Sequence, residues 1–442
     1  MAVILRSNMP YRGAIADLPP INAPMPADAA LYADFLNDLH ITAAYRGTEP
    51  AQIFDFSGMR ERFLRNVDGG YAQAAAGAAG RVEYNAAGQR LGMLLEGSQS
   101  QLITAAQRLD LTQAAASGVA VAAGALPTNL WDRWYTLTPS GDAAHDLAFA
   151  STASLAANTR RGFAIELKTA GHRYVQLSSG AAGDADDYAN FDLQTKAVVS
   201  QGPGIVFAAV LPTVDGAICY IQYQSATAAV ETPTVSIIAT PTSGKQAAAT
   251  AVSVGAVAAR LPKLKTRNSG ETARVPPLSP LFNADSVLGD RFNLNGGMQS
   301  SDFTFLVRAR NSPWVNSFTP TLFGLFVGQA IGTGAALRVG SSGALVLVTR
   351  TSGTVAAVQT LAATLPADGI TTFAFSKTGN VLRFAIGSET YEGELPQIAG
   401  TQPFILSSPV DLEGFDGHLQ RIIGWSHGKT LAQLQTLLAE GI

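Results

Sequence analysis

The sequence predicts a mainly β protein that has two antiparallel β-sandwich domains after an extended N-terminal arm with a short helix. From about residue 110 onward, short apolar runs of period two recur between Gly, Pro, Asp and Asn turns, which is the pattern of an antiparallel sandwich or jelly roll. A zone rich in Pro, Ser, Thr and Gly, from about Thr240 to Pro280, separates these runs into two sets. A chain of 442 residues is also long enough for two or three cores.

Residues 1–52 are expected to form an arm for attachment or assembly. The stretch LPPINAPMP predicts an extended, polyproline-like chain. Asp28 is placed to cap an amphipathic helix over DAALYADFLNDLH. The apolar face of this helix would contain Leu31, Phe35, Leu36 and Leu39. So short a helix cannot bury that face by itself, and we expect it to dock on the rest of this chain or on another subunit.

The first set of strands is predicted from the runs GFAIELKTA, RYVQLSS, AICYIQYQS and VSIIATP. In RYVQL, Tyr174 falls on the opposite face from Val175 and Leu177, so one face can be core and the other solvated. The zone from Thr240 to Pro280 is the best linker candidate, although its apolar middle, 252–261, is also a strand candidate.

The second set of strands is predicted from FTFLVRARN, TLFGLFVG, AALRVG, ALVLVTR, TTFAFSK, VLRFAIG and ETYEGEL. Near the C-terminus, TLAQLQTLLAEG predicts a helix with Leu431, Leu434, Leu437 and Leu438 on one stripe. The chain therefore divides into an arm (1–52), a connector (53–108), a first sandwich (109–256) and a second sandwich (257–442).

The composition excludes several classes of protein. Charged residues make up 14% of the chain, the formal charge is −3 and no basic cluster is present, which argues against nucleic-acid binding. The single cysteine, Cys219, excludes an intrachain disulfide and a multi-cysteine metal site, and we expect it to be a small buried side chain. An early Arg6 argues against a secretory signal, and no apolar run reaches the roughly 18 residues of a membrane helix. We therefore expect a protein made in a cytosol without membrane insertion.

No motif predicts catalysis or a cofactor. Phosphate loops, dinucleotide loops, zinc-protease motifs and nucleophile elbows are all absent from the sequence. The five histidines are scattered, and no pair of acids stands out as the two carboxylates of a glycosidase. We therefore expect a protein that is not an enzyme.

The densest acidic stretch is GDADDYANFD. Asp184, Asp186 and Asp187 lie in a glycine-bounded loop and are candidate calcium ligands, but the spacing of a twelve-residue calcium loop is missing. The alternative is a solvated turn.

Aromatic side chains are the candidates for binding sugar rings. The stretch NLWDRWYTL holds Trp131, Trp134 and Tyr135, and strand alternation puts Trp131 and Tyr135 on one side and Trp134 on the other. At least one ring would then face solvent, and Tyr188 and Trp314 complete the set of candidates. The alternative is that these are ordinary core aromatics.

One segment resembles a connector found in tailed-bacteriophage virion structural proteins. There, a phrase of the type DFS leads through a short charged and apolar alternation to a Gly-Leu-Leu-rich turn. The matching positions here are Asp55, Phe56, Ser57, Arg81, Tyr84, Gly88, Gly92, Leu94, Leu95, Glu96 and Gly97. The resemblance implies that residues 53–108 introduce a fibre or spike β-domain.

Two later segments resemble the domains that follow this connector, in the same order. ANFDLQT is similar to a hairpin of a jelly roll like a carbohydrate-binding module, with matches at Phe191, Asp192, Leu193 and Thr195. GFDGHLQRIIGWSHGKTLAQLQTLLAEG is similar to the end of a concanavalin- or laminin-G-like domain. The matches are at Gly417, His418, Arg421, Trp425 and Leu431.

The resemblance implies a virion structural protein, a head spike, decoration protein or tail fibre, made in the bacterial host and assembled with capsid or tail proteins. Its sandwiches would bind host-surface polysaccharide, with weak single-site affinity multiplied by many copies. A homo-oligomer is expected and a trimer favoured, although the sequence contains no heptad repeat. The alternatives are a purely architectural decoration protein and a depolymerase that cleaves its glycan.

Overall fold

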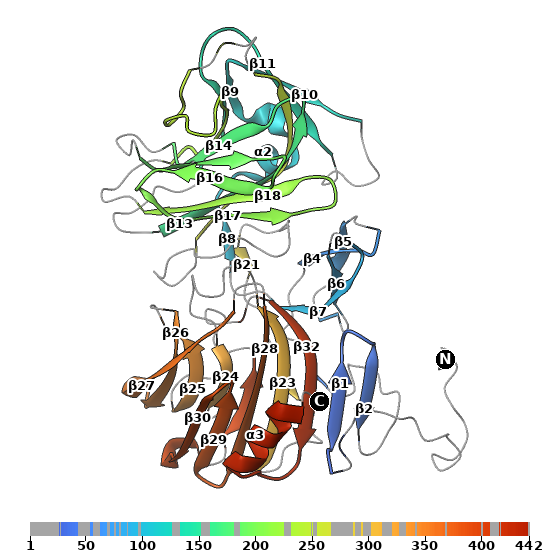
Figure 1. Ribbon diagram of the computed structural model, residues 1–442, viewed down its shortest axis with the longest axis vertical. Helices are drawn as coiled ribbons and strands as arrows, with labels where there is room; N and C mark the ends of the chain where they lie inside the picture. The colour runs from blue at the N-terminus through green and yellow to red at the C-terminus, as the bar shows by residue number, and fades with distance from the viewer. Residues whose placement is uncertain are drawn as a thin grey trace, which may run out of the picture.

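The computed structural model consists of two β-sandwiches (Figure 1). It describes residues 26, 28–42, 54–55, 62–68, 71–74, 77–78, 81–85, 87–95, 99–125, 133–151, 160–180, 186–224, 231–248, 250, 254–266, 286–287, 293–294, 302–311, 321–326, 333–340, 343–366, 369–398, 401–406, 415 and 417–440. The mainly β class predicted from the sequence is confirmed.

The first sandwich packs a larger sheet against a six-stranded one. The larger sheet contains, in spatial order, β10 (Val119–Ala123), β11 (Tyr135–Pro139), β20 (Ala256–Thr266), β13 (Arg160–Ala170), β18 (Ala217–Gln224) and β17 (Ile205–Pro212). The six-stranded sheet contains β16 (Ala197–Gln201), β15 (Tyr188–Asp192), β14 (Tyr174–Ser178), β19 (Thr234–Ile237), β12 (His145–Ala148) and β9 (Ala115–Ser117). One core lies between them and includes Phe163, Cys219 and Phe191. The short helices α2 (Ala105–Leu109) and η2 (Leu111–Gln113) precede β9.

The second sandwich packs a longer sheet against a five-stranded one. The longer sheet contains β2 (Leu39–Thr42), β1 (Leu31–Asp34), β32 (Gly417–Trp425), β23 (Phe303–Asn311), β28 (Ile370–Thr378), β29 (Val381–Ile386) and β30 (Glu389–Glu394). The five-stranded sheet contains β27 (Thr354–Thr364), β26 (Ala344–Thr351), β25 (Gly334–Val339), β24 (Thr321–Phe326) and β31 (Gln402–Ile405). Phe323 from one sheet stacks on Phe375 from the other with ring centroids 4.3 Å apart, so a shared core joins the two layers.

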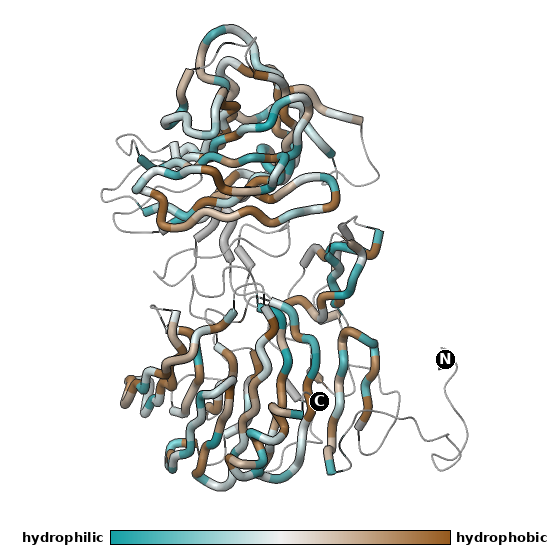
Figure 2. The backbone as a smooth tube through the Cα atoms, in the orientation of Figure 1, coloured by the Kyte–Doolittle hydropathy of each residue, from teal (hydrophilic) through white to brown (hydrophobic). Residues whose placement is uncertain are grey.

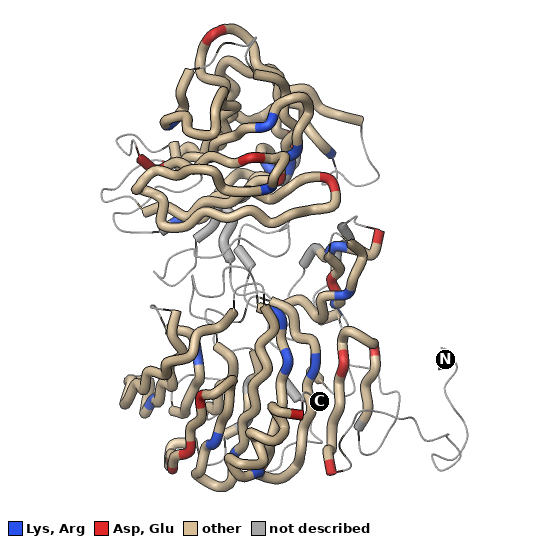
Figure 3. The backbone as a smooth tube through the Cα atoms, viewed as in Figure 1, with Lys and Arg blue, Asp and Glu red and all other residues tan. Residues whose placement is uncertain are grey.

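The strand predictions are confirmed by pattern as well as by position. Each apolar run of period two named from the sequence became a strand, and Figure 2 shows hydrophobic and hydrophilic residues alternating along many of them. Lys, Arg, Asp and Glu of both signs lie on each sandwich (Figure 3). Within the described residues, no helix is long and apolar enough to cross a membrane.

The N-terminal residues form a β-hairpin, and the helix predicted over DAALYADFLNDLH was wrong. β1 and β2 pair antiparallel. In the turn between them, Asp34 Oδ1 accepts hydrogen bonds from the N–H groups of Leu36 and Asn37 at 2.9 and 3.0 Å, and Asp38 has φ +56°. β1 also pairs with β32, and strand pairing with a distant part of the chain overrides a local helical pattern.

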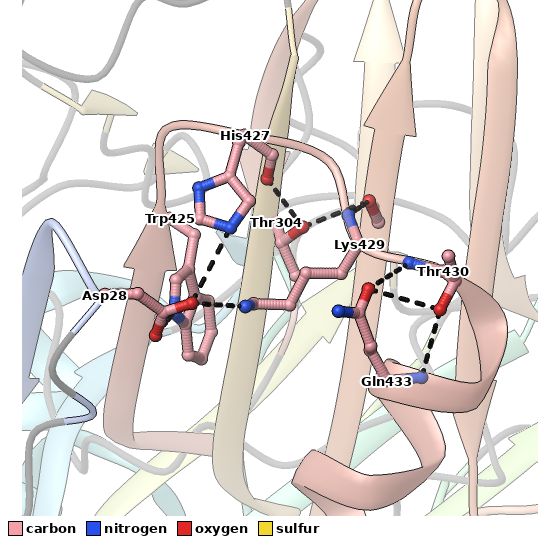
Figure 4. Close-up of polar contacts among 8 residues, drawn as sticks. Asp28, Thr304, Trp425, His427, Lys429, Thr430 and Gln433 are labelled. Atoms are coloured by element: carbon pink, nitrogen blue, oxygen red, sulfur yellow. Dashed lines mark hydrogen bonds and ion pairs between the residues drawn. The ribbon is translucent and has the colours of Figure 1, made fainter.

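Asp28 therefore caps no helix and instead fastens the hairpin to the second sandwich. Its carboxylate accepts hydrogen bonds from Trp425 Nε1 at 2.9 Å and from Lys429 Nζ at 2.7 Å. His427 Nε2 lies 3.7 Å from the same carboxylate, and Figure 4 shows the three side chains around Asp28. The pKa of Asp28 is lowered chiefly by the Lys429 hydrogen bond.

The C-terminal helix α3 (Leu431–Glu440) is confirmed. Thr430 and Gln433 cap it reciprocally, because the Thr430 N–H donates to Gln433 Oε1 at 2.8 Å and the Gln433 N–H donates to Thr430 Oγ1 at 3.3 Å (Figure 4). Leu434 and Leu437 are buried beneath the helix, which lies against β28 and β29.

Of the matched connector residues, Tyr84 and Gly88 lie at a tight turn, whereas Phe56, Ser57, Glu96 and Gly97 lie outside the described residues. β6 (Val82–Tyr84) and β7 (Arg90–Leu95) pair antiparallel. Between them, Asn85 Oδ1 accepts hydrogen bonds from the N–H groups of Ala87 and Gln89, both at 2.9 Å. Gly88 has φ +74°, a conformation that favours glycine. The turn explains why NAAG interrupts the apolar run.

The same connector joins the long sheet of the second sandwich. β7 pairs with β32, and a Cβ at Gly92 would lie only 2.4 Å from the carbonyl oxygen of Leu419. Glu83 Oε2 and His418 Nε2 form a buried pair at 2.7 Å. Leu94 and Leu95 of the connector thus pair with His418 and Gly417 of β32, and all four are positions that carry the resemblance.

The second sandwich is consequently built from both ends of the chain, with the first sandwich inserted between them. The chain enters the insert through β8 (Gln99–Gln101) and leaves it through β20, and β8 pairs with β20 and with β21 (Ser286–Val287). β20 confirms the strand candidate at 252–261. It extends to Thr266, past the boundary drawn at residue 256.

Three smaller pieces lie outside the main sheets of the two sandwiches, although their residues Phe54, Leu64 and Ile398 belong to the core of the second one. β3 (Phe54–Asp55) pairs with β22 (Asn293–Leu294), and β4 (Arg62–Arg65) pairs with β5 (Tyr71–Ala74). A short 3-10 helix, η7 (Pro396–Ile398), precedes β31.

Candidate functional site

The six-stranded sheet of the first sandwich has a polar outer face. The inward side chains of its strands, among them Val175 and Phe191, belong to the core. The alternate residues point outward, and strand register aligns one from each strand into a row. In order across the sheet the row contains Ser200, Asn190, Gln176, Ser236, Asp146 and Ser117. We call this set the polar row.

The opposite sheet of the same sandwich offers no comparable face. On its outer side, Ala164, Ile218 and Tyr220 form an apolar cluster, and Phe207 and Leu211 of β17 pack against the core of the second sandwich. The polar row is therefore on the side of the first sandwich that does not contact the second one.

Residues 240–247 form a loop that covers one half of the polar row. Gln176 Nε2 donates to the carbonyl oxygen of Gly244 at 2.9 Å, and Gln176 Oε1 accepts from the Gln246 N–H at 2.6 Å. Asn190 Nδ2 donates to the carbonyl oxygen of Ser243 at 2.8 Å. Gln176 and Asn190 are fully buried by this loop and bond each other at 2.8 Å.

An ion pair fixes the same loop at a second point. Lys245 Nζ contacts the carboxylate of Asp187, and both side chains are largely buried. Ser200 Oγ, at the end of the polar row, donates to the carbonyl oxygen of Pro241 at 2.6 Å. Loop 240–247 is therefore held by side chains of the sheet beneath it, through its own backbone.

The other half of the polar row contains buried groups without hydrogen-bond partners. Ser236, which is 2% exposed, interacts with the side chain of Asp146. Ser178, one residue pair away, is fully buried, and its hydroxyl has no hydrogen-bond partner among the described residues. Asp146 Oδ1 also has none, and burial raises the pKa of this carboxyl. Unpaired buried polar groups are rare in proteins and call for an explanation.

Tyr188 lies beside this half of the row. It is directly opposite Ser178 in the strand register and is half-buried. A Cβ at Gly202 would approach its ring to 3.0 Å, so the tyrosine ring packs over a glycine. The structure thus brings together one partly exposed aromatic ring, the partnerless hydroxyl of Ser178 and the Ser236–Asp146 pair.

The tryptophan-rich stretch does not form this site. Tyr135, one of the predicted binding residues, is 2% exposed and lies in the core of the first sandwich. Trp134 has two cations against its ring, Lys168 Nζ at 4.2 Å and Arg260 Cζ at 4.4 Å from the ring centroid. These contacts occupy the ring that a sugar would need. Trp131 and Trp314 lie outside the described residues.

The structure describes two of the three candidate calcium ligands. Asp184 lies outside the described residues. Asp186 is exposed, and Asp187 is buried against Lys245. Among the residues that the structure describes, no three His, Cys, Asp or Glu side chains are grouped to hold a metal ion.

The FDLQT segment is a structural turn. Asp192 accepts hydrogen bonds from the Gln194 N–H and from Thr195 Oγ1, at 2.9 and 2.7 Å, and forms a close pair with Arg173. The Arg173 hydrogen bond holds the pKa of Asp192 well below its usual range. The matched residues thus position the hairpin of β15 and β16.

A buried acid that the sequence did not single out lies in the same sandwich. Glu231 is fully buried and accepts hydrogen bonds from Arg161 Nε at 3.2 Å and Tyr223 Oη at 3.1 Å. Burial raises the pKa of Glu231 to about 7, against the opposing charge of Arg161. These three residues are too far apart in the chain for any motif to connect them.

No family model matches this sequence, and no curated protein is similar to it. The structure is similar to the CBM40 of the Ruminococcus gnavus IT-sialidase bound to alpha2,3 sialyllactose, at 10% identity and a TM-score of 0.24, over 32% of this chain and 83% of that one. It is also similar to a SAP-like pentraxin from Limulus polyphemus, at 12% identity and a TM-score of 0.23, over 31% and 70%. A toad ovary galectin in complex with thio-digalactose matches at 6% identity and a TM-score of 0.20, over 30% and 88%. These likenesses concern the sandwich fold alone.

Proposed function

We propose that this chain is a structural protein of a tailed-phage virion whose first sandwich binds host-surface glycans through the polar row and Tyr188. The observation that carries the proposal is the partnerless hydroxyl of Ser178 and the partnerless Asp146 Oδ1, next to a half-buried aromatic ring. Sugars present hydroxyl groups that both donate and accept hydrogen bonds, together with apolar ring faces that pack on aromatic side chains.

The charges around the polar row favour a neutral glycan. Asp146 is the one acid in the row, and the cations nearby, Lys245 and Arg173, are already paired with Asp187 and Asp192. An acidic sugar would bring a second negative charge without a free cation to meet it. We therefore expect neutral oligosaccharides to bind and sialylated or uronic-acid sugars to be rejected.

Loop 240–247 controls access in this proposal. The loop covers the buried side chains of Gln176 and Asn190, so a ligand reaches this half of the row only when the loop moves. The loop is held chiefly by hydrogen bonds from Gln176 and Asn190 to its backbone, and sugar hydroxyls can replace such bonds one for one.

The insertion of the first sandwich into the second determines which of the two would lie nearer the particle. The N-terminal hairpin, which belongs to the predicted arm (1–52), is part of the second sandwich, so attachment through this arm would place the second sandwich next to the particle. The first sandwich would then project away from the particle, with its polar row on the side that does not contact the second sandwich. This arrangement supports adhesion over a purely architectural role, in which both sandwiches would contact only neighbouring virion proteins.

The carboxylates of this face support binding over cleavage. Glycosidases use two carboxyl groups about 5–10 Å apart on either side of the bond. On the described part of the polar face, Asp192 and Asp187 are engaged by Arg173 and Lys245, which leaves Asp146 alone.

The decisive test compares three single variants of the full chain on an array of neutral and acidic oligosaccharides. Ser178→Ala removes a hydroxyl that bonds nothing among the described residues of the free protein, so stability should be unchanged or slightly higher. Tyr188→Ala removes the ring. Each should weaken neutral-glycan binding by about tenfold, roughly 1.4 kcal/mol.

Thr321→Val is the matched control. Thr321 is buried in the second sandwich and its hydroxyl also lacks a partner, so this change removes the same kind of group away from the polar row. Equal glycan binding by all four proteins, or no binding by any of them, would contradict the proposal and favour the architectural role. Release of soluble sugar fragments would favour a depolymerase.

A further inference from the structure

The strand β27 forms an unusually exposed edge of the five-stranded sheet. It stands last in the strand order, next to β26 alone. All seven residues from Thr354 to Thr360 are exposed, and the apolar side chains of Val355 and Val358 are 49% and 58% exposed. Alternate residues of such a strand direct their backbone N–H and C=O groups away from the sheet.

β27 lacks the charges that normally protect an edge strand. From Thr351 to Ala367 the sequence contains no charged residue. The edge strand β30 of the neighbouring sheet shows the usual protection, since Glu389, Glu392 and Glu394 would repel the same strand of another molecule. An uncharged, apolar edge of eleven residues is by contrast suited to pairing with a second strand.

The strand is presented in a fixed geometry. The turn that joins it to β26 has positive φ at Ser352 (+49°) and Gly353 (+83°), as in the tight turns of two-residue hairpins. The Ser352 N–H donates to Thr333 Oγ1 at 3.0 Å, which ties the turn to the sheet. At the other end, Leu361 is buried in the core. The edge is therefore preformed and would lose little conformational entropy on pairing.

We propose that β27 pairs antiparallel with β27 of a second copy of this chain, about a two-fold axis near Val358. The partner is a second copy because an uncharged strand is complementary to itself: the two-fold axis opposes identical neutral side chains and brings no like charges together. The contact is isologous and joins two five-stranded sheets into one. It gives a dimer, in place of the trimer favoured from the family resemblance, and it is independent of glycan binding.

Sedimentation velocity of the full chain over a hundredfold range of concentration tests this pairing. The wild-type chain of 46.0 kDa should show a concentration-dependent dimer. Val358→Lys places a cation opposite its own copy and should raise the dissociation constant at least tenfold. Val214→Lys is the matched control, because Val214 is also exposed, at 45%, but lies in the first sandwich; it should leave the dimer intact.

A mixing experiment separates edge pairing from a general effect of the added charge. Val358→Lys and Val358→Glu should each be monomeric alone and should associate when mixed, because opposite charges then face each other across the strand pair. A wild-type chain that stays monomeric throughout, or an oligomer that Val358→Lys does not weaken, would overturn the proposal. So would a failure of the mixed variants to associate.

Discussion

Glu231 should make the first sandwich less stable as the pH rises from about 4.5 to 7. The carboxyl is fully buried, and its pKa is raised from 4.5 to about 7 in the folded chain. The folded state therefore holds a proton that the unfolded state releases. A raised pKa of this kind gives stability that is fully present below 4.5 and is lost as the pH rises through 7.

The magnitude follows from the difference in pKa. About 2.5 pH units at 1.36 kcal/mol each give roughly 3 kcal/mol between the two ends of this window. The paired aspartates, such as Asp192, do not contribute there, because their pKa values are lowered and their effect lies below pH 4. Asp146, whose pKa burial also raises, adds to the decline. His40 acts in the opposite direction but belongs to the hairpin of the second sandwich.

The measurement must therefore be local. Hydrogen exchange of peptides covering β13, β18 and Glu231, followed at pH 5, 6, 7 and 8 and corrected for the intrinsic pH dependence of exchange, reports the stability of the first sandwich alone. Protection should fall across the series. Glu231→Gln, which keeps one acceptor oxygen and the shape of the side chain but cannot ionise, should flatten the dependence. Protection that rises from pH 5 to pH 7 would refute the reasoning, since that is the behaviour of a carboxylate whose pKa is lowered.

Three further predictions concern single contacts. Arg421→Ala removes the cation that lies 3.0 Å from the buried Asp34 carboxylate. It should lower the stability of the N-terminal hairpin by about 3 kcal/mol, measured as faster hydrogen exchange of β1 and β2. Unchanged exchange would contradict this prediction. Gly92→Ala places a Cβ against the backbone at φ +121° and should destabilise the connector by about 1–3 kcal/mol, measured as a lower Tm. Gly141→Ala is the comparison variant. Gly141 has open space around it but φ +72°, so this change should show the smaller effect of backbone strain alone. Lys245→Ala should free loop 240–247, raise its exchange rate and strengthen glycan binding; an unmoved loop would show that the ion pair does not hold it.

The strands and the terminal helix were predictable because their signals are local. Period-two alternation between turn residues is enough to place a strand such as β23, whose bounds match FTFLVRARN. The Leu stripe of α3 likewise needs no distant partner to be recognised.

The N-terminal hairpin was not predictable by the same means. The spacing of Leu31, Phe35 and Leu39 suits a helix, but the free energy of pairing β1 with β32 decides the outcome, and that partner lies nearly 400 residues away. The insertion of the first sandwich escaped prediction for the same reason, since β7 also pairs with β32.

The candidate site was only partly visible in the sequence. Tyr188 was among the aromatic candidates. The outer face of RYVQLSS was expected to be solvated, but Gln176 and Ser178 on that face are buried. The alignment of Ser236, Gln176 and Asn190 depends on strand register, which a single sequence does not reveal. Trp134 was misleading because only the folded sheets bring Lys168 and Arg260 against its ring.

The most direct test of the central claim is a hydrogen-exchange footprint of the full chain, recorded with and without the neutral oligosaccharide that binds best on the array. If the polar row is the binding face, protection should increase in β14, β15, β19 and loop 240–247 and stay unchanged in β10, β11 and the second sandwich. Protection confined to the tryptophan-containing stretch before β11, or to the second sandwich, would contradict the account.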